Sequence, residues 1–453
     1  SFLLLYFHPI FFGHLAINPK DIVLATSHIW VFYLILEYFK KQNEFFNSNK
    51  IILKISLFLA LGTGVQLYFV ASLLPIMLFV IFDIFIFKKI LNNNFIILKF
   101  FKDFFKVVLL SYFIIVFFWV DTHSNIFIRP FELFLDSFST YRGWPANLLN
   151  GNIFYSLEAS KLYVLLMTFY KTPEYILYLS FFLLIIFFRK NFFFKNSISF
   201  FNYKLLIFLL IICFPTFIMV VNPFPVYDGL RLFLWYVPYT LIFSSLAIFY
   251  LIENLQNLFC KLFFSINFLL VLYYLVYFFS YTPYQYTYLN FFSGSSEEKR
   301  IKFENDYWGT SLEELIRKIK KEHKLKDNKI LKVYMCAIPG WIVESAIKKY
   351  KLDYIELTSL DEADYILLTN RTIVSYEPKE KISLCNSLVR NEVFSVNNSQ
   401  HPERAQLLRD NPAQHSLILS LHFLWQCPGA AYLPYWKKKR ALRQSSLIYL
   451  MLS

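Results

Sequence analysis

Long apolar blocks separated by polar loops dominate the first 281 residues of this chain. There are eight such blocks, the last of them directly after the first seven: Ile22–Phe39, Ile51–Val70, Ala71–Phe87, Phe105–Val120, Tyr163–Phe188, Leu205–Val221, Leu230–Leu251 and Leu262–Ser280. A helix needs about 20 mostly apolar residues to cross a bilayer. The blocks therefore predict a polytopic α-helical membrane protein of about eight spans. Their unbroken apolar character excludes a membrane barrel, whose strands alternate.

Lysine is unevenly distributed among the loops that join these blocks. The loops 40–50, 88–106 and 189–204 are rich in lysine, whereas the loops 121–160 and 222–231 contain none. Because lysine and arginine in short loops mark the cytoplasmic side of a membrane protein, the first set of loops is predicted to face the cytoplasm. The second set then faces outward, and it contains distinctive polar motifs. We therefore expect the functional site at the outer face of the cytoplasmic membrane.

Composition narrows the functional classes further. The chain has 453 residues, of which 57% are hydrophobic, and a formal net charge of +14. Lysines beside anionic lipid headgroups account for most of this charge. No nucleic-acid-binding motif accompanies it, so we predict membrane lipid as a partner and no nucleic acid. The chain also lacks a Walker loop, a dinucleotide-binding glycine motif and an HExxH motif, which argues against an ATPase subunit or an intramembrane zinc protease.

The chain changes character twice after its apolar blocks. Beyond residue 282, short strands alternate with amphipathic helices, and near residue 400 the sequence loses Phe and Asn and gains Ala, Gln, Arg and Pro. We predict a transmembrane domain at 1–282, a small extracytoplasmic α/β domain at 283–398 and an atypical tail at 399–453. We interpret the tail as a frameshift or assembly artefact, with a genuine basic tail as the alternative. The run Phe2–Phe7 is typical of the end of a span, so we expect the first spans to be missing.

The predicted α/β domain contains recognisable elements. They are a capping-box helix from Ser311 to about Lys324, a strand at Ile330–Cys336, a helix at Trp341–Tyr350 and a strand at Tyr365–Thr369. The five cysteines of the chain show no metal-binding spacing. Cys336 and Cys385 could pair outside the cytoplasm, but we favour free thiols.

The first outward loop contains His14 followed by Asn18-Pro19-Lys20-Asp21. Lys20 could bind a lipid phosphate as a point charge, and Asp21 could orient a sugar hydroxyl, hold a metal or assist proton transfer. The same order of residues also suits helix capping, with Asn18 at the cap, Pro19 at the first helical position and Asp21 favouring the helix dipole. Capping explains neither His14 nor Lys20, so both interpretations stand.

The second motif is Tyr227-Asp228-Gly229-Leu230-Arg231, at the outer end of two apolar blocks. A guanidinium at the edge of an apolar helix is costly unless it is paired, and Arg231 could grip a phosphate with two hydrogen bonds. Asp228 would then tune this arginine or bind sugar, and Gly229 would permit close approach of the backbone. We favour this interpretation over a local ion pair between Asp228 and Arg231 that only closes a turn.

Two further segments carry candidate binding residues. Lys171 lies at a predicted helix break near the outer face, where it could contact a lipid phosphate or simply snorkel to the interface. Tyr141, Arg142 and Trp144 form a cluster that could stack on a sugar, although an ordinary interfacial belt of aromatic residues is the favoured alternative. We interpret the NDYWG run that follows position 304 as an aromatic turn without a functional role.

Taken together, these motifs resemble the bacterial branch of the dolichyl-phosphate-mannose–protein mannosyltransferase-like proteins, family 39-like members of the GT-C superfamily of membrane glycosyltransferases. The resemblance covers about residues 11–370 and depends on an ordered set of short motifs: Phe11-Phe12-Gly13-His14, Asn18-Pro19-Lys20-Asp21, Asn150-Gly151, Lys171-Thr172-Pro173, Tyr227-Asp228-Gly229-Leu230-Arg231, Pro283-Tyr284-Gln285-Tyr286, Tyr288-Leu289-Asn290 and Asp306-Tyr307-Trp308-Gly309. Relatives are expected often to carry an arginine between Lys54 and Lys88, where this chain has no basic residue.

The resemblance implies inverting transfer of a sugar from a polyprenyl-phosphate donor to an acceptor at the outer face of the bacterial cytoplasmic membrane. Asp21 is then the catalytic candidate, and the substrate-binding candidates are His14, Asn18, Lys20, Tyr141, Arg142, Trp144, Lys171, Tyr227, Asp228 and Arg231. Lys20, Lys171 and Arg231 are the candidate phosphate contacts among them. In the family the leading catalytic carboxylate lies on an earlier outward loop, which we expect to precede residue 1. The resemblance requires no cofactor, although it allows a divalent cation, and it identifies neither the sugar nor the acceptor.

Two functions from other classes remain as alternatives: a secondary transporter and a non-catalytic membrane assembly protein. Transporters tend to show corresponding helix breaks in two repeats, and this sequence shows no such symmetry. Their ionisable residues also lie deep within spans, whereas here these residues gather at the outer ends. An assembly protein would use the α/β domain to bind its partner.

Overall fold

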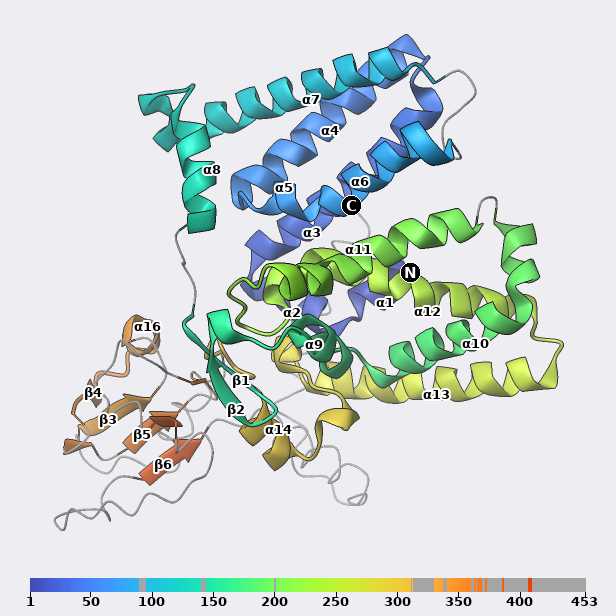
Figure 1. Cartoon of the computed structure of the whole chain (residues 1–453). Helices are drawn as coiled ribbons and strands as arrows, with labels where there is room; N and C mark the ends of the chain where they lie inside the picture. Colours follow the sequence, from blue (N-terminus) through green and yellow to red (C-terminus); the bar gives the residue numbers. More distant parts are fainter. Residues whose placement is uncertain are drawn as a thin grey trace, which may run out of the picture. The chain divides into compact units, whose positions relative to one another are not determined.

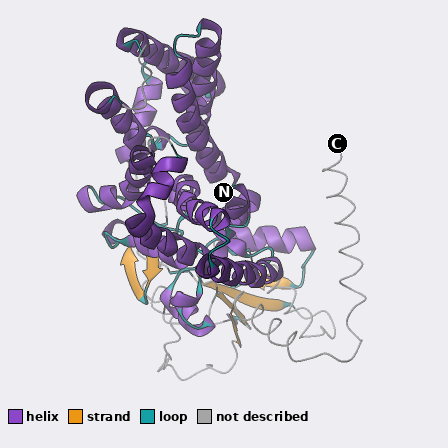
Figure 2. Cartoon of the chain, turned by 90° about the vertical axis from the view of Figure 1, so that its right-hand side faces the viewer, coloured by secondary structure: helices purple, strands orange, loops and turns teal. Residues whose placement is uncertain are grey.

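Helices make up most of the described chain (Figure 2). The computed structural model describes residues 1–88, 95–139, 144–198, 201–310, 312, 330–336, 340–359, 362–363, 365–368, 371–372, 385–386 and 406–409. The capping-box helix predicted from Ser311 to about Lys324 lies outside these residues except at Leu312, and Tyr141 and Arg142 also lie outside them. Of the predicted tail at 399–453, only residues 406–409 are described. The described residues all belong to one unit, Ser1–Asn411.

The first group of helices includes α3 (Pro19–Lys41), whose first turn contains the candidate residue Asp21. Its members are α1 (Phe2–Tyr6), α2 (Pro9–Ile17), α3 (Pro19–Lys41), α4 (Phe45–Val65), α5 (Phe69–Ser72), α6 (Leu74–Phe82), the π-helical turn η1 (Asp83–Phe87), α7 (Ile97–Phe118), the short η2 (Val120–Ser124) and α8 (Arg129–Ser139). Helix α4 contacts both α3 and α7 (Figure 1). Helix α4 ends at Val65, and the chain turns through Gln66 before α5 begins.

A second group of helices follows. It comprises η3 (Ser156–Glu158), α9 (Tyr163–Lys171), α10 (Glu174–Ser197), α11 (Phe201–Val221), η4 (Arg231–Tyr236), α12 (Val237–Glu253) and α13 (Leu258–Ser280). Helix α10 contacts α12 and α13 (Figure 1). The predicted break between Lys171 and Glu174 is confirmed: α9 and α10 meet at a bend of 114°. Pro173 causes this break, because proline cannot donate a helical hydrogen bond and clashes with the preceding turn.

The helices confirm a polytopic helical membrane protein. Among the described residues, five helical stretches are long and apolar enough to cross a membrane, and there are six if the bent pair α9–α10 counts as one span. The five are Pro19–Lys41, Phe45–Val65, Phe201–Val221, Arg231–Glu253 and Leu258–Ser280. Two of the predicted blocks are less simple. The stretch Leu74–Phe87 is shorter, and the first half of α7 carries Lys102, Asp103 and Lys106 among its apolar residues.

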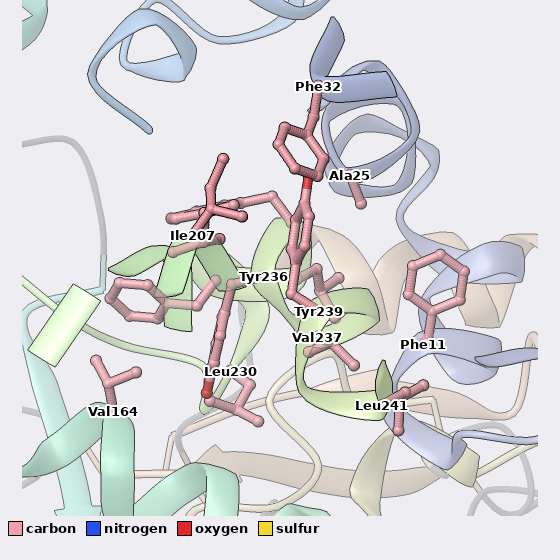
Figure 3. Packing of buried hydrophobic residues seen from close by; sticks show 14 of the residues in the cluster. Phe11, Ala25, Phe32, Val164, Ile207, Leu230, Tyr236, Val237, Tyr239 and Leu241 are labelled. Atoms are coloured by element: carbon pink, nitrogen blue, oxygen red, sulfur yellow. The ribbon is translucent and has the colours of Figure 1, made fainter. Parts of the chain in front are cut away.

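One hydrophobic core joins the two groups of helices. Phe11 from α2, Phe32 from α3 and Tyr239 from α12 belong to it, together with Ile207 from α11 (Figure 3). A buried hydrogen bond of 2.7 Å between His28 Nδ1 and the Tyr239 hydroxyl also links α3 to α12. Helix α3 contacts η4 as well. This packing brings the start of α3 next to the start of η4, and the functional candidates lie at both starts.

A β-hairpin separates the two groups of helices along the chain. Strands β1 (Ala146–Leu149) and β2 (Asn152–Tyr155) pair in antiparallel register. Asn150 and Gly151 form the turn with φ values of 51° and 83°. Asn-Gly suits a two-residue hairpin of this kind because both positions need positive φ. The turn-rich segment of the sequence is therefore a hairpin loop.

The C-terminal part of the described chain contains a parallel sheet. Short helical segments η5 (Gln285–Thr287), η6 (Phe291–Ser293) and α14 (Ser296–Lys302) precede it, and its elements are β3 (Leu331–Cys336), α16 (Gly340–Tyr350), β4 (Ile355–Leu357), β5 (Tyr365–Leu368) and β6 (Gln406–Arg409). The strand order is β4-β3-β5-β6. A small core of buried apolar side chains includes Val333, Val343 and Leu367. The two predicted strands and the helix between them are present within one residue of their predicted ends.

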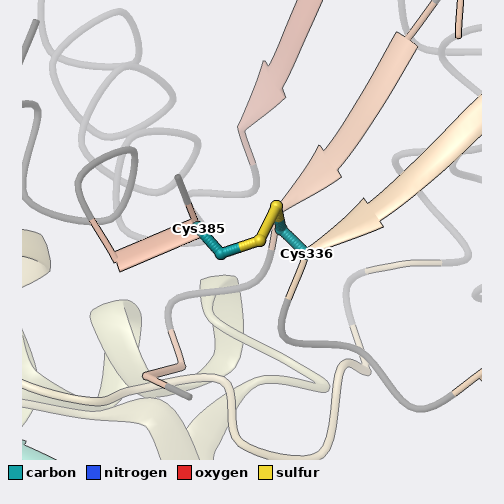
Figure 4. Close-up of a disulfide and its surroundings, with 2 residues drawn as sticks. All are labelled: Cys336 and Cys385. Carbon is teal, nitrogen blue, oxygen red and sulfur yellow. A yellow bond between two sulfur atoms is a disulfide. The ribbon is translucent and has the colours of Figure 1, made fainter. Parts of the chain in front are cut away.

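A disulfide joins Cys336, at the end of β3, to Cys385 (Figure 4). Their Cα atoms are 5.3 Å apart, and 49 positions separate them in sequence. The favoured expectation of free thiols is therefore wrong for this pair. The fold returns Cys385 to the end of β3, and sequence spacing alone does not reveal such a return. Cys213 and Cys260 are free.

Candidate functional site

Five ionisable side chains, alternately acidic and basic, form a connected chain. Asp21, Arg231, Asp228, Arg371 and Glu304 follow one another, with contacts of 3.0, 2.7, 2.8 and 3.0 Å between successive members. They come from four separate segments of the sequence. We call this arrangement the charge chain. A buried ion pair is costly to assemble unless its geometry is good, so five such groups in contact mark this place as a candidate site.

Asp21 lies in the first turn of α3 and is only 1% exposed. Its carboxylate accepts hydrogen bonds from Arg231 Nε at 3.0 Å and from Gln66 Nε2 at 3.1 Å. Asn18 occupies the cap position of α3, but its side-chain amide donates to Asp21 and makes no capping hydrogen bond. The capping interpretation therefore predicts the position of Asn18 correctly and its side-chain partner wrongly.

Arg231 follows a tight turn. Asp228 and Gly229 both have positive φ, 56° and 63°, and the turn lets Arg231 reach back to Asp228. The local ion pair considered as an alternative is thus present, at 2.7 Å, but the same guanidinium also contacts Asp21. The carbon Cζ of Arg231 lies 4.8 Å from the Trp308 ring and 5.9 Å from the Tyr227 ring. Aromatic faces attract cations at such distances.

Lys171 is buried, with 1% of the residue exposed, at the end of α9. Its Nζ donates to the Tyr286 carbonyl at 3.2 Å and to Asn305 Oδ1 at 3.4 Å. No carboxylate within the described residues forms an ion pair with it. The snorkelling alternative is therefore wrong, because the side chain points into the protein. Gly229 packs beside this side chain: a Cβ there would lie at an ordinary contact distance of 3.5 Å from Lys171 Cε.

His14 is fully buried, and its Nε2 lies 2.8 Å from the Tyr307 hydroxyl. Burial, with smaller effects from Arg231 and Lys171, lowers the pKa of His14 to about 3. The ring is therefore neutral and holds Tyr307 in place. Lys20, by contrast, is exposed at the start of α3. It remains accessible to a ligand at this end of the helix.

Trp144 contacts two other residues of the protein, Arg371 and Thr372. Its ring lies 3.8 Å from Arg371 Cζ, and its Nε1 donates to the Thr372 carbonyl at 2.8 Å. Of the cluster predicted with Tyr141 and Arg142, the structure describes only Trp144. Trp144 supports Arg371 in this structure, in the way that a guanidinium stacks on an aromatic face.

Arg371 and Glu304 complete the charge chain, and neither was predicted from the sequence. Arg371 follows β5, is 9% exposed and donates to Asp228 Oδ1 at 2.8 Å and to the Tyr307 carbonyl at 2.7 Å. Glu304 is 3% exposed. Burial raises the pKa of Glu304 to about 8, although the nearby Arg371 opposes this shift. We favour the raised pKa because neither carboxyl oxygen makes a well-formed hydrogen bond.

The aromatic turn after position 304 also belongs to the site. Tyr307 contacts His14, Trp308 lies against Arg231, and Asp306 accepts a hydrogen bond from Tyr286. The turn therefore packs against the charge chain, which the sequence did not indicate; whether it has a functional role stays a question for the proposed function. The motif itself was visible in the sequence. No signal in the sequence pointed to Arg371.

A divalent cation has no obvious place among these groups. Nowhere in the described part of the chain do three histidine, cysteine, aspartate or glutamate side chains come together as metal ligands. Asp21 and Asp228 are both engaged by Arg231. The chemistry that the arrangement offers is that of arginines and a lysine for an anion, beside carboxylates able to take a proton.

Comparison with known proteins identifies no relative. No family model, curated protein or solved structure matches this chain. The resemblance to family 39-like glycosyltransferases therefore stays a prediction from motifs.

Proposed function

We propose that this protein transfers a sugar from a polyprenyl-phosphate-linked donor to an acceptor at the outer face of a bacterial cytoplasmic membrane. The observation that carries the proposal is the position of Arg231. One guanidinium, at the start of a membrane-spanning stretch, is held between the carboxylates of Asp21 and Asp228. The ends of spans lie at the depth of lipid headgroups. A guanidinium there suits a lipid phosphate, because its planar fork matches two phosphate oxygens.

The neighbouring cations fit the same ligand. Lys20 is exposed beside Asp21, and the side chain of Arg231 is 17% exposed. In this proposal the donor phosphate binds between these two cations and replaces Asp21 as a partner of Arg231. Lys171 is more buried than these two cations, and it acts electrostatically on His14 together with Arg231. Its burial without a paired carboxylate in the described chain favours an anion nearby, since an isolated buried charge is costly.

Asp21 is the base in this proposal. The oxygen of an acceptor hydroxyl attacks the anomeric carbon, and the bond from that carbon to the phosphate oxygen breaks. The bonding electrons leave with polyprenyl phosphate, and the hydroxyl proton passes to Asp21. Attack from the face opposite the leaving group inverts the anomeric carbon. Arg231, once it binds the phosphate, stabilises the charge that develops on the leaving group.

The parallel sheet is proposed to be an extracytoplasmic α/β domain. The Cys336–Cys385 disulfide supports this location, because disulfides persist in oxidising compartments. Arg371, directly after β5 of this sheet, contributes to the charge chain. The proposed domain would therefore lie on the same side of the membrane as the donor phosphate.

A transfer assay tests the proposal. Purified protein receives polyprenyl-phosphate mannose or glucose with a radiolabelled sugar, and released or transferred sugar is measured. Arg231→Ala is expected to lose activity at least about tenfold, as expected for one lost charged contact of 1.4 kcal/mol or more, and Lys20→Ala less. Arg129→Ala is the control, since it removes an exposed arginine that pairs with the exposed Glu132. Absence of both transfer and hydrolysis, with donor binding unchanged in Lys20→Ala and Arg231→Ala, would contradict the proposal.

A further inference from the structure

Three buried polar atoms around the Asp21–Arg231 pair have no hydrogen-bond partner among the described residues. They are Gln66 Oε1, Tyr68 Oη and Trp308 Nε1. The Gln66 amide lies near Tyr68 Oη, but without the geometry of a hydrogen bond. A buried polar atom without a partner costs about 1–3 kcal/mol, and such atoms are rare in folded proteins. Three such atoms beside one ion pair indicate that a bound ligand forms hydrogen bonds with them.

The three side chains reach this place from two distant segments. Gln66 ends α4, and its Nε2 donates to Asp21 at 3.1 Å. Tyr68 follows in the break before α5, close enough to interact electrostatically with Asp21 and Arg231. Trp308 lies far from Gln66 and Tyr68 in sequence, and the centre of its ring is 4.8 Å from the guanidinium carbon of Arg231. The three polar atoms therefore share the surroundings of one ion pair.

The orientation of the Gln66 amide limits the chemistry of the ligand. Asp21 pairs with Arg231 as a carboxylate, which only accepts hydrogen bonds, so Gln66 must direct its Nε2 toward Asp21. The free Oε1 is then an acceptor that needs a donor. Trp308 Nε1 is a donor that needs an acceptor, and the Tyr68 hydroxyl can do either. A phosphate monoanion group bonded to lipid and sugar offers acceptors only, whereas sugar hydroxyls offer both donors and acceptors.

We infer that Gln66, Tyr68 and Trp308 form the sugar-recognising wall of the donor site, and that the sugar carries free hydroxyl groups and no carboxylate. The inference depends on the proposed function. It adds which side chains bind the phosphate of the donor and which bind its sugar. Arg231 binds the phosphate, and the wall binds hydroxyls of the sugar attached to it. The rings of Tyr68 and Trp308 supply apolar faces for the C–H face of the sugar. The carboxylates of Asp21 and Asp228 disfavour a sugar that carries a carboxylate of its own.

Binding measurements with matched lipids test this inference. The probes are polyprenyl-phosphate mannose, polyprenyl-phosphate glucose and bare polyprenyl phosphate, each bound to the purified protein. Gln66→Leu, Tyr68→Phe and Trp308→Phe are each expected to weaken binding of a glycosylated probe about 3- to 10-fold, the equivalent of one hydrogen bond. Binding of bare polyprenyl phosphate is expected to stay the same. Trp30→Phe and Tyr33→Phe, at exposed positions of α3, are matched controls.

Each result decides between the inference and the proposed function. Equal weakening for glycosylated and bare lipids, or no weakening for any probe, overturns the inference while the phosphate site stands. A wild-type protein that binds none of the three lipids overturns the proposed function and the inference with it. A deoxy-sugar donor provides a test that needs no folded variant. Wild-type protein must bind at least one mono-deoxy analogue more weakly, and if it binds all of them as tightly as the parent donor, the inference is wrong.

Discussion

Arg231 donates a hydrogen bond of 3.0 Å to Asp21, which lies 210 positions earlier in the chain. The two residues begin separate membrane-spanning stretches, and these stretches start at the same place because α3 packs against η4. The contact is therefore a product of helix packing, not of local sequence. It places an arginine and a carboxylate where a lipid phosphate and a sugar acceptor would meet in the proposed function.

Gly13→Ala is expected to destabilise the site. A Cβ at Gly13 would lie 2.3 Å from the Tyr286 backbone nitrogen, so α2 or the segment around Tyr286 must shift. Overpacking of this kind typically costs about 1–3 kcal/mol, and thermal unfolding in detergent should show a lower midpoint. Gly64→Ala is the control, because its nearest contact would be an ordinary 3.6 Å from Trp119. Equal midpoints for the two variants would contradict the close approach at Gly13.

Arg371→Ala is expected to destabilise the protein far more than a surface ion-pair variant. Removing Arg371 breaks its contacts with two buried side chains, Asp228 and Glu304. Breaking a buried ion pair costs about 3–5 kcal/mol. Lys332→Ala breaks an exposed pair with Glu362, which is worth about 0–1 kcal/mol. Thermal unfolding of both variants measures the difference. Similar midpoints would show that Arg371 has no structural part in the charge chain.

The stability of the protein is expected to fall as the pH rises toward 8, because of Glu304. Burial raises the pKa of Glu304 to about 8, whereas an unfolded glutamate titrates near about 4.3. Between these values the folded protein holds a proton that the unfolded chain has lost. The stabilising contribution is therefore complete below the unfolded pKa and is lost as the pH rises through about 8.

Thermal midpoints from about pH 5 to pH 9 test this dependence. Glu304→Gln should flatten the decline, because an amide cannot ionise. Glu362→Gln should keep it, since Glu362 is exposed and its pKa is lowered by Lys332. A decline of the same size in Glu304→Gln as in the wild type would assign the effect to another group.

The Cys336–Cys385 disulfide is expected to stabilise the sheet region. It closes a loop of 49 residues, for which the loss of chain entropy in the unfolded state corresponds to about 4 kcal/mol. Cys336→Ser with Cys385→Ser should therefore lower the unfolding midpoint, whereas Cys213→Ser should not. Thiol labelling without reductant checks the bond directly. Labelling of Cys336 or Cys385 before reduction would show that the pair is not formed.

The sequence predicted the parts of this fold that depend on local pattern. Long apolar blocks predicted the membrane-spanning helices, and Pro173 predicted the bend between α9 and α10. The roles of Asp21 and Arg231 as site candidates were also visible, because a guanidinium at the edge of an apolar helix demands a partner. Each of these predictions needs only a few neighbouring residues.

The parts that were missed depend on contacts between distant segments. Arg371 contacts Asp228, which lies 143 positions earlier in the chain. The residues next to Arg371 in sequence do not predict this contact. Trp308 looked like a turn residue until the fold placed it against Arg231. The sequence left Lys171 open between a phosphate contact and a snorkelling lysine, because its burial depends on the distant Tyr286 carbonyl and on Asn305.

Equilibrium binding of two lipids that differ only in a phosphate tests the central claim most directly. Polyprenyl phosphate and polyprenol, which lacks the phosphate, are compared on the wild-type protein and on Arg231→Ala. The wild type is expected to bind polyprenyl phosphate at least about tenfold more tightly, which corresponds to 1.4 kcal/mol, and Arg231→Ala is expected to lose that preference. Equal binding of the two lipids by the wild type would show that Arg231 is not a phosphate site and would contradict the account.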